Sequence, residues 1–496
     1  METMTKDLKK HFFHGVVWSG TRRFLEQGIQ TVTTLVLARI LSPHEFGIIG
    51  IANIFILFAN TINRLGIVSA LIQRKEIDEG HLSSAFWANM VTGVTLCLIM
   101  MSISFPAAKF FQNEEVQPVL FTLSFIFIIG ALNVVQTAQF SRSFQFGKLA
   151  GFSIWEMSTN AVISIGLATA GFGVWSLVWG RLGGVLMGVV VAWYSSSWRP
   201  KWLFNPAKFQ ELFKFGIYSL SINILTYLGQ SMDGIIVGRF LGVGPLGIYT
   251  MAHNLVSLPQ RKMSSVIASV AFPVFSRIQD DHARVSRNYL KMLRYISFVT
   301  FPLLIGLMVL APLFVRIILG EKWAAAIVPI QIMCVLGMYS SLSTTVGSIF
   351  SAKGRPDLEL KTDVVLLIAL AGFLMVGVRY GIIGVAVAVT LMSLVSKPFI
   401  FYIVARLLRI RLLEIYKANF WAFISSLVMA LVMLGTDYIL QTVFHAPMAV
   451  RLILLVPVGA GAYWRLQKIF RIETLSEVYE IFMSNIKSKE KLKVAS

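Results

Sequence analysis

Long apolar segments, separated by short polar connections, follow one another along almost the whole chain. A segment of about 20 mostly apolar residues can cross a membrane as a helix, and about fourteen are predicted, with ends placed to within about 4 residues. They cover residues 13–41, 46–72, 82–108, 116–140, 146–171, 173–195, 209–236, 245–275, 285–311, 325–351, 358–378, 381–405, 415–440 and 448–466. The pattern predicts an all-α integral membrane protein.

The first segment has a polar face, which is unusual for a helix expected to contact lipid. Helical spacing places these polar residues on one side: Ser19, Arg22, Arg23, Glu26, Gln27, Gln30, Thr33 and Thr34. The opposite side carries Phe24, Leu25, Ile29, Val32 and Val36. A charged side chain at mid-bilayer costs from ~2.5 to more than ~10 kcal/mol. We therefore expect the apolar side to face lipid and the polar side to face a water-filled interior.

Three other segments carry similar polar stripes. The second has Asn53, Asn60 and Arg64; the seventh has Asn223, Thr226, Tyr227, Gln230 and Asp233; the eighth has Asn254, Ser257, Arg261 and Ser264, with Lys262 beside them. Segments 1, 2, 7 and 8 are the first two segments of each half of the chain. We expect their polar faces to line a cavity between two lobes.

Composition agrees with a membrane protein, since 56% of the 496 residues are hydrophobic and only 14% are charged, against about 25% charged in soluble proteins. Of the 44 Lys and Arg residues, 27 fall in one set of connections and termini and 7 in the opposite set. Because basic residues concentrate in cytoplasmic loops, both termini are predicted to be cytoplasmic. The net charge of +20 is spread over many segments, which argues against a nucleic-acid partner.

Two sequence stretches about 200 residues apart match each other and predict an internal repeat. "LARILSPHEFGII" at 37–49 parallels "VGRFLGVGPLGIY" at 237–249, and "FGVWSLV" at 172–178 parallels "YGIIGVA" at 380–386. Both halves would begin on the cytoplasmic side, so the repeat is parallel. The predicted organisation is a six-helix lobe at 1–205, a second at 206–410, two further spans at 411–470 and a basic cytoplasmic tail at 471–496.

The stretches "VLARILSPHEFGIIGIANI", "IQRKEI", "AFPVFSRIQDD" and "LGEKWAAAIVPIQIMCVLG" resemble the polysaccharide transport family of lipid-linked oligosaccharide flippases. That family belongs to a superfamily with the multidrug and toxin extrusion antiporters and the lipid II flippases. The resemblance implies a fourteen-helix, two-lobed, alternating-access transporter in the bacterial inner membrane. It would move undecaprenyl-diphosphate-linked repeat units to the periplasmic leaflet for exopolysaccharide, O-antigen or capsule synthesis. Polysaccharide polymerase and chain-length proteins would be further partners.

The deep charges favour an anionic cargo. Five cations are the candidate substrate-binding residues: Arg22, Arg23, Arg64, Arg261 and Lys262. Five further polar residues are the candidates for lining the cavity or coupling ion flow: Glu26, Gln27, Gln30, Gln230 and Asp233. The fork of an arginine suits phosphate in particular. The alternative for Arg22 and Arg23 is a structural ion pair with Glu26, and for the other three an anchoring role at the cytoplasmic end.

Rival functions are a lipid II flippase, a drug or cation antiporter, and a membrane glycosyltransferase or polymerase. A cation antiporter needs carboxylates in its cavity, and here the deep cations outnumber Glu26 and Asp233. A glycosyltransferase would need a soluble catalytic domain or a large loop, which the short connections do not provide. Cys97 and Cys334 lie inside apolar runs and form neither a disulfide framework nor a metal pair. No cofactor, metal site or enzymatic activity is expected.

Overall fold

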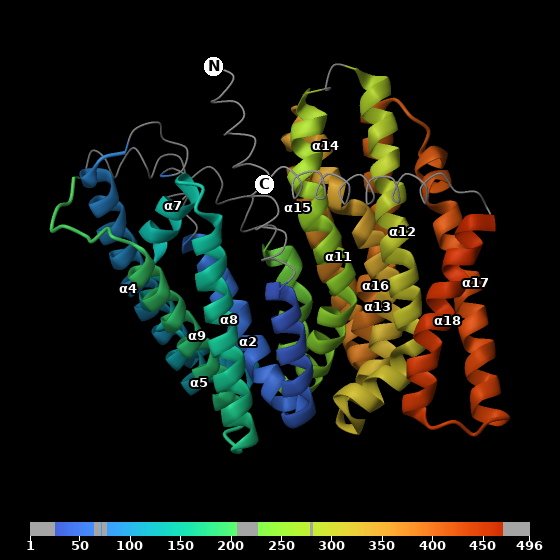
Figure 1. Ribbon diagram of the computed structural model, residues 1–496, viewed down its shortest axis with the longest axis horizontal. Coiled ribbons are helices and arrows are strands. Elements are labelled where there is room, and N and C mark those ends of the chain that lie inside the picture. The colour runs from blue at the N-terminus through green and yellow to red at the C-terminus, as the bar shows by residue number, and fades with distance from the viewer. Residues whose placement is uncertain (1–24, 64–70, 72–76, 206–226, 278–280, 470–496) are drawn as a thin grey trace, which may run out of the picture. The chain divides into compact units, whose positions relative to one another are not determined.

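The computed structural model describes residues 25–63, 71, 77–205, 227–277 and 281–469. Helices are the only regular secondary structure in these described ranges, and Figure 1 shows them as long rods joined by short turns. The all-α architecture predicted from the apolar segments is confirmed. The chain divides into two compact units, residues 1–250 and 251–496.

The first unit is built from helices that the apolar segments predict closely. Residues 25–40 and 227–240 are helical, and the other helices are α2 (Pro43–Asn63), α4 (Glu79–Phe111), α5 (Val116–Leu123), α6 (Ile126–Ala131), α7 (Val134–Arg142), α8 (Phe146–Thr169), α9 (Val174–Ser195) and the start of α11 (Val243–Arg277). Helices α8 and α9 form an antiparallel pair, and α4 packs against α5 and α6. The predicted turn between segments 146–171 and 173–195 lies where α8 ends. Gly171 and Gly173 adopt positive φ in this turn.

The second unit contains the rest of α11 and the helices that follow it. These are α12 (His282–Phe314), α13 (Ile327–Leu342), α14 (Val346–Ala352), α15 (Pro356–Gly377), α16 (Gly381–Leu408), α17 (Leu412–Thr442) and α18 (Met448–Ile469). Helix α12 packs against α13 and α17, and α18 packs against α17 and α12. The last two predicted spans therefore pack on α12 as part of this unit.

Eight helical stretches in the described residues are long and apolar enough to cross a membrane, and the bent pair formed by Val116–Ala131 and Val134–Arg142 is a ninth candidate. One of the eight, Asp357–Leu408, has 52 residues and at 1.5 Å per residue would extend about 78 Å, more than twice the apolar thickness of a bilayer. It reverses at Gly381, whose φ is 71°, so it supplies two crossings. The total of fourteen stays a prediction, because segments 13–41, 46–72 and 209–236 extend into residues that are not described, and α8 and α11 are not among these candidate stretches.

Matching local structures at equivalent places support the internal repeat. Asp78 caps α4 by accepting a hydrogen bond from the third residue of the helix, and Asp281 caps α12 in the same way. Gly173 and Gly381, which the sequence match pairs, both adopt positive φ, one just before α9 and the other at the start of α16. The equivalent spans 116–142 and 327–352 are both interrupted. These matches are local, and the predicted lobe boundaries at 205 and 410 stay a prediction.

Two matched glycines allow α2 to cross the start of α11 at backbone contact. A Cβ atom on Gly47 would overlap the carbonyl oxygen of Val243, and one on Gly247 would overlap the carbonyl oxygen of Pro43. Pro43 and Val243 are also equivalent positions of the repeat. The two helices therefore contact each other through equivalent residues. Close approach of this kind is the usual role of small residues between helices in membranes.

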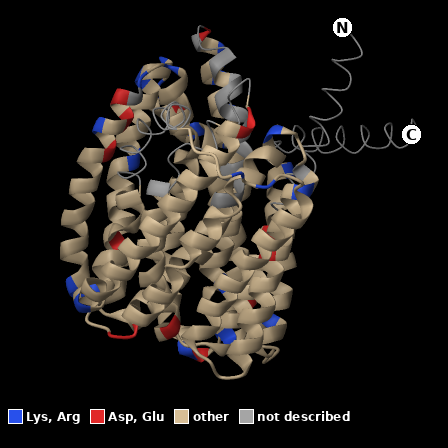
Figure 2. Ribbon diagram, turned by 90° about the vertical axis from the view of Figure 1, so that its left-hand side faces the viewer, with Lys and Arg blue, Asp and Glu red and all other residues tan. Residues whose placement is uncertain are grey.

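Charged side chains gather near the ends of the helices. Figure 2 shows Lys, Arg, Asp and Glu mostly at the two ends, with the middle of the helices made of other residues. This distribution is expected where the middle of each helix contacts lipid tails and the ends reach the headgroups. The few charges at mid-helix therefore need partners or water.

Candidate functional site

The structure does not describe the side chains of the five candidate substrate cations. Arg22, Arg23 and Arg64 lie outside the described residues. Arg261 and Lys262 belong to α11, but their side chains are likewise outside the described part of the structure. Their shared role in binding therefore stays a prediction.

The described part of the first polar stripe is helical, as predicted. Gln27 donates a hydrogen bond to the hydroxyl of Thr31 over 3.3 Å, one turn further along. Thr33 and Thr34 bond back to the carbonyl oxygens of Ile29 and Gln30. Glu26 is partly exposed. These bonds satisfy the threonine hydroxyls within the helix.

Asp233 is engaged in the first unit by the start of α11. The phenol of the buried Tyr249 donates a hydrogen bond of 2.6 Å to one carboxylate oxygen of Asp233, and the backbone N–H of Gly234 donates one of 2.8 Å to the other. Gln230, one turn earlier, is exposed. Asp233 therefore fastens residues 227–240 to α11, and a coupling role for it stays a prediction.

A second polar contact joins three spans inside the first unit. Arg181 of α9 donates a hydrogen bond to the side-chain oxygen of Asn53 on α2, and it interacts electrostatically with Glu156 on α8. A Cβ atom on Gly188 would lie 3.1 Å from Glu156 Oε2, so α9 is also packed tightly against this carboxylate. Arg181 therefore links α2, α8 and α9 through polar contacts within the first unit.

The second unit holds its own charged contacts. Lys397 of α16 interacts electrostatically with Asp363 of α15, and Asp363 also interacts with Glu359 one turn earlier. Near the opposite end of the spans, Arg451 of α18 makes a bidentate pair with Asp437 of α17, at 2.8 and 2.7 Å. Lys397 and Arg451 therefore each have a carboxylate neighbour on the preceding helix.

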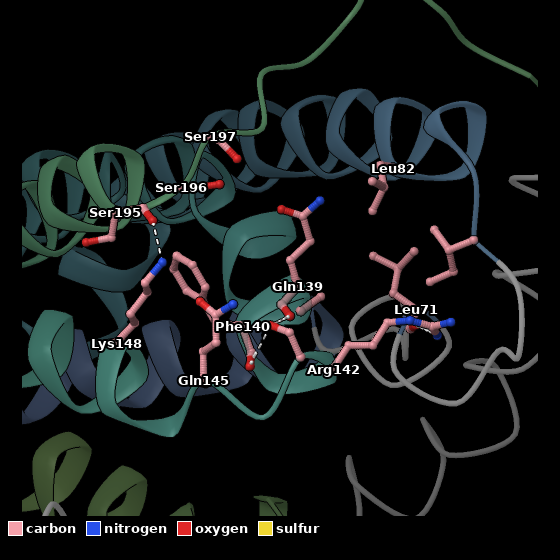
Figure 3. Close-up of a pocket in the computed structure, with 13 residues that line it drawn as sticks. Leu71, Leu82, Gln139, Phe140, Arg142, Gln145, Lys148, Ser195, Ser196 and Ser197 are labelled. Carbon is pink, nitrogen blue, oxygen red and sulfur yellow. Dashed lines mark hydrogen bonds between the residues drawn. The ribbon is translucent and has the colours of Figure 1, made fainter.

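A cavity of about 520 Å³ opens beside the ends of α7 and α9 and the start of α8. Figure 3 shows Lys148 and Arg142 on either side of Gln139, with Ser195, Ser196 and Ser197 above them. The full lining is Leu71, Ile77, Leu82, Ala138, Gln139, Phe140, Arg142, Ser143, Gln145, Lys148, Ser195, Ser196 and Ser197. Two cations, several hydroxyl and amide groups and one apolar wall thus share a single hollow.

Each cation of this cavity is held by the backbone of another segment. Lys148 donates a hydrogen bond of 3.1 Å to the carbonyl oxygen of Ser195 and lies 5.3 Å from the ring centre of Phe140. Arg142 donates one of 3.3 Å to the carbonyl oxygen of Leu71. These bonds orient both side chains at the edge of the cavity.

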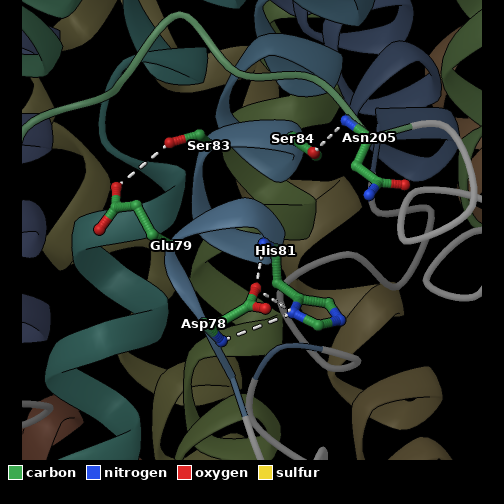
Figure 4. Close-up of polar contacts among 6 residues, drawn as sticks. All are labelled: Asp78, Glu79, His81, Ser83, Ser84 and Asn205. Atoms are coloured by element: carbon green, nitrogen blue, oxygen red, sulfur yellow. Dashed lines mark hydrogen bonds and ion pairs between the residues drawn. The ribbon is translucent and has the colours of Figure 1, made fainter.

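The connection after α9 is fastened to the first turns of α4. Lys201 donates its backbone N–H to Ser83 over 3.2 Å, and Asn205 donates its backbone N–H to Ser84 over 2.8 Å. Figure 4 shows the second of these bonds beside the Asp78–His81 cap, in which the histidine Nδ1 lies 2.6 Å from the carboxylate. Trp198 also donates a hydrogen bond of 2.9 Å to Glu79.

The sequence interpretation missed the cavity at Lys148 and Arg142. Both residues were counted only as markers of the cytoplasmic side. A signal was present in the two cations on either side of the turn between α7 and α8 and in the run of three serines at 195–197. Nothing in the spacing shows that these two stretches meet, because they are about 50 residues apart. Within the described residues, no group of three or more His, Cys, Asp and Glu side chains is placed to hold a metal ion.

Comparison with known proteins identifies the family. Residues 36–328 match a family described as "Polysaccharide biosynthesis protein". The chain is 28% identical over 416 residues to the lipopolysaccharide biosynthesis protein WzxC of Escherichia coli (strain K12), covering 80% of this chain and 82% of that protein. It is 28% identical over 462 residues to the teichuronic acid biosynthesis protein TuaB of Bacillus subtilis (strain 168), covering 92% and 94%.

Two solved structures share the fold. The lipid II flippase MurJ in an inward closed conformation aligns with a TM-score of 0.75 at 16% identity, covering 93% of this chain and all of that one. An inward-facing multidrug resistance transporter of the MATE family aligns with a TM-score of 0.61 at 14% identity, covering 77% and 98%. At such identities the likeness concerns the fold alone. The match over residues 36–328 shows that the chain belongs to the polysaccharide biosynthesis protein family of multi-spanning membrane proteins.

Proposed function

We propose that the protein is a flippase for lipid-linked oligosaccharides. It moves undecaprenyl-diphosphate-linked repeat units from the cytoplasmic to the periplasmic leaflet of the bacterial inner membrane, for exopolysaccharide, O-antigen or capsule synthesis. Both termini lie in the cytoplasm, and transport proceeds by alternating access between two lobes. Polysaccharide polymerase and chain-length proteins are its partners in the same assembly process.

The family match over residues 36–328 carries this proposal. Relatives along most of the chain are named for lipopolysaccharide and teichuronic acid biosynthesis, and a third, ExoT of Rhizobium meliloti (strain 1021), is named a succinoglycan biosynthesis transport protein. The fold shared with a flippase and with exporters fits transport. These polymers differ in their sugars, so the shared element of the cargo is the lipid carrier and its diphosphate.

The cationic character of the polar stripes supports an anionic cargo over a cationic drug. Arg22 and Arg23 on the first segment, Arg64 on the second, and Arg261 and Lys262 on the eighth would contact the diphosphate or acidic sugars. Arginine pairs with phosphate through two parallel hydrogen bonds, whereas a cation antiporter depends on carboxylates. Glu26, Gln27, Gln30, Gln230 and Asp233 would line the same water-filled path.

Charge reversal at the candidate cations tests this proposal in cells. Arg64→Glu and Arg261→Glu should each lower polymer export and cause lipid-linked oligosaccharide to accumulate in the inner leaflet, because an acidic side chain repels the diphosphate. Arg23→Ala should abolish export, and Arg23→Lys should restore part of it by keeping the charge without the fork. Export at the parental rate in all of these variants, at equal membrane abundance, would contradict the binding role.

A further inference from the structure

We propose that the cavity between Arg142, Lys148 and Ser195–Ser197 binds the phosphate headgroup of a lipid in the cytoplasmic leaflet. The proposal concerns a site on the flank of the first unit, built by α7, α8 and α9, and it shares no residue with the polar stripes. It stands whether or not the protein transports oligosaccharides, since the ligand class is an anionic lipid that carries phosphate, and zwitterionic phosphatidylcholine should bind more weakly.

The chemistry of the lining fits a phosphate on a lipid. Two cationic side chains stand on either side of Gln139, and none of the 13 lining residues is acidic (Figure 3). Ser143, Ser196 and Ser197 add hydroxyl donors to the same hollow. A phosphate accepts hydrogen bonds from all of these groups, and its bonds to lysine and arginine are charge-assisted and short.

One wall of the cavity suits the chain to which such a phosphate is attached. Leu71, Ile77 and Leu82, which pack in one apolar cluster, form an apolar side of the cavity. A soluble anion would gain nothing from this wall, whereas a lipid buries the first part of its hydrocarbon tail there. The volume of about 520 Å³ is within the range of about 300–1,000 Å³ that small-ligand sites occupy.

The cavity lies at the depth where headgroups are found. Tyr194 directly precedes the lining serines and is 92% exposed, and Trp202 on the adjoining connection is 91% exposed. Trp202 stacks on Trp87 with ring centres 4.3 Å apart, which fixes its position. Exposed tyrosine and tryptophan collect at the membrane–water interface, and the distribution of basic residues assigns this end of the helices to the cytoplasmic side. A headgroup of that leaflet therefore reaches the cavity without leaving the membrane.

Lipid binding to the purified full-length protein tests the site. Native mass spectrometry would count bound phosphatidylglycerol, undecaprenyl diphosphate and phosphatidylcholine, each added separately, with inorganic diphosphate as a soluble probe. Arg142→Gln and Lys148→Gln should each lower the affinity for an anionic lipid about fivefold, because each removes one charge-assisted contact to the phosphate. Lys201→Gln removes an exposed cation of the adjoining connection that does not line the cavity, so it should leave the affinity unchanged.

A filling variant separates the site from a general loss of charge. Gln139→Phe keeps both cations and occupies the space between them, so it should weaken binding as much as either charge variant. If the variants lose affinity only for phosphatidylglycerol, the site binds membrane phospholipid. If they lose affinity only for undecaprenyl diphosphate, the site binds the carrier lipid. The proposal is overturned if these variants, eluting as monodisperse protein, bind both anionic lipids as the parent does. It is also overturned if inorganic diphosphate binds while neither anionic lipid does.

Discussion

At the residue scale, the most demanding positions are the glycines at the crossing of α2 and α11. A methyl group on Gly247 would overlap the carbonyl oxygen of Pro43, and a backbone oxygen cannot rotate aside as a side chain can. The sequence paired Gly47 with Gly247 as equivalent members of a repeat. It could not show that the two helices touch there, because equivalence in a repeat does not imply contact.

Gly247→Ala should therefore destabilise the protein by about 1–3 kcal/mol, the usual cost of adding a methyl group to a packed contact. Gly244→Ala is the matched control, since a Cβ atom there meets nothing within 4 Å and alanine favours a helix over glycine. The measurement is the temperature at which each purified variant loses its monodisperse elution peak. Equal temperatures for the two variants would contradict the close crossing.

At the element scale, the apolar runs predicted helix positions well because the thickness of a bilayer fixes the length of each run. Helix α9, expected at 173–195, spans Val174–Ser195, and α16, expected at 381–405, spans Gly381–Leu408. The contacts between helices were not predictable in the same way. Arg181 and Asn53 are 128 residues apart, and the partner of Asp233 is a tyrosine that carried no signal in the polar pattern.

Removing the charge of Arg181 should loosen the contact among α2, α8 and α9. Arg181→Met leaves the carboxylate of Glu156 without its cation inside the membrane, at a cost of about 3–5 kcal/mol. The double variant Arg181→Met/Glu156→Gln removes both charges and should recover much of that loss. The same elution assay at increasing temperature measures the difference. A double variant no more stable than Arg181→Met would show that the two charges do not depend on each other.

The polar stripe of the first segment should be reached by water on one side only. Cys97 and Cys334 are both buried, so replacing them provides a background for single cysteines. Cysteine at Gln27 or Gln30 should react with a membrane-impermeant thiol reagent, whereas cysteine at Leu25 or Ile29 should not, because the apolar side is expected to face lipid. Equal reaction at all four positions would remove the basis for a water-filled interior.

At the scale of the whole molecule, the 27 and 7 basic residues on the two sides predict the orientation in the membrane. The structure ends α4 at Phe111, begins α11 at Val243 and ends α17 at Thr442. Reporter proteins fused after residues 110, 243 and 443 should therefore all be active in the periplasm. A cytoplasmic reading at any of the three would refute the predicted number of spans.

The central claim is that the protein carries lipid-linked oligosaccharide across the membrane, and reconstitution tests it most directly. Purified protein and lipid-linked oligosaccharide would be placed in liposomes under a proton gradient, a sodium gradient or neither. The fraction of sugar cleaved by an externally added, membrane-impermeant glycosidase would then be measured. Without transport, cleavage stops once the outer-leaflet sugar is consumed, at about half. Transport predicts that cleavage continues past this point with the protein and stops there in protein-free liposomes. Cleavage that stops at the same level with and without the protein, under every gradient, would contradict the claim.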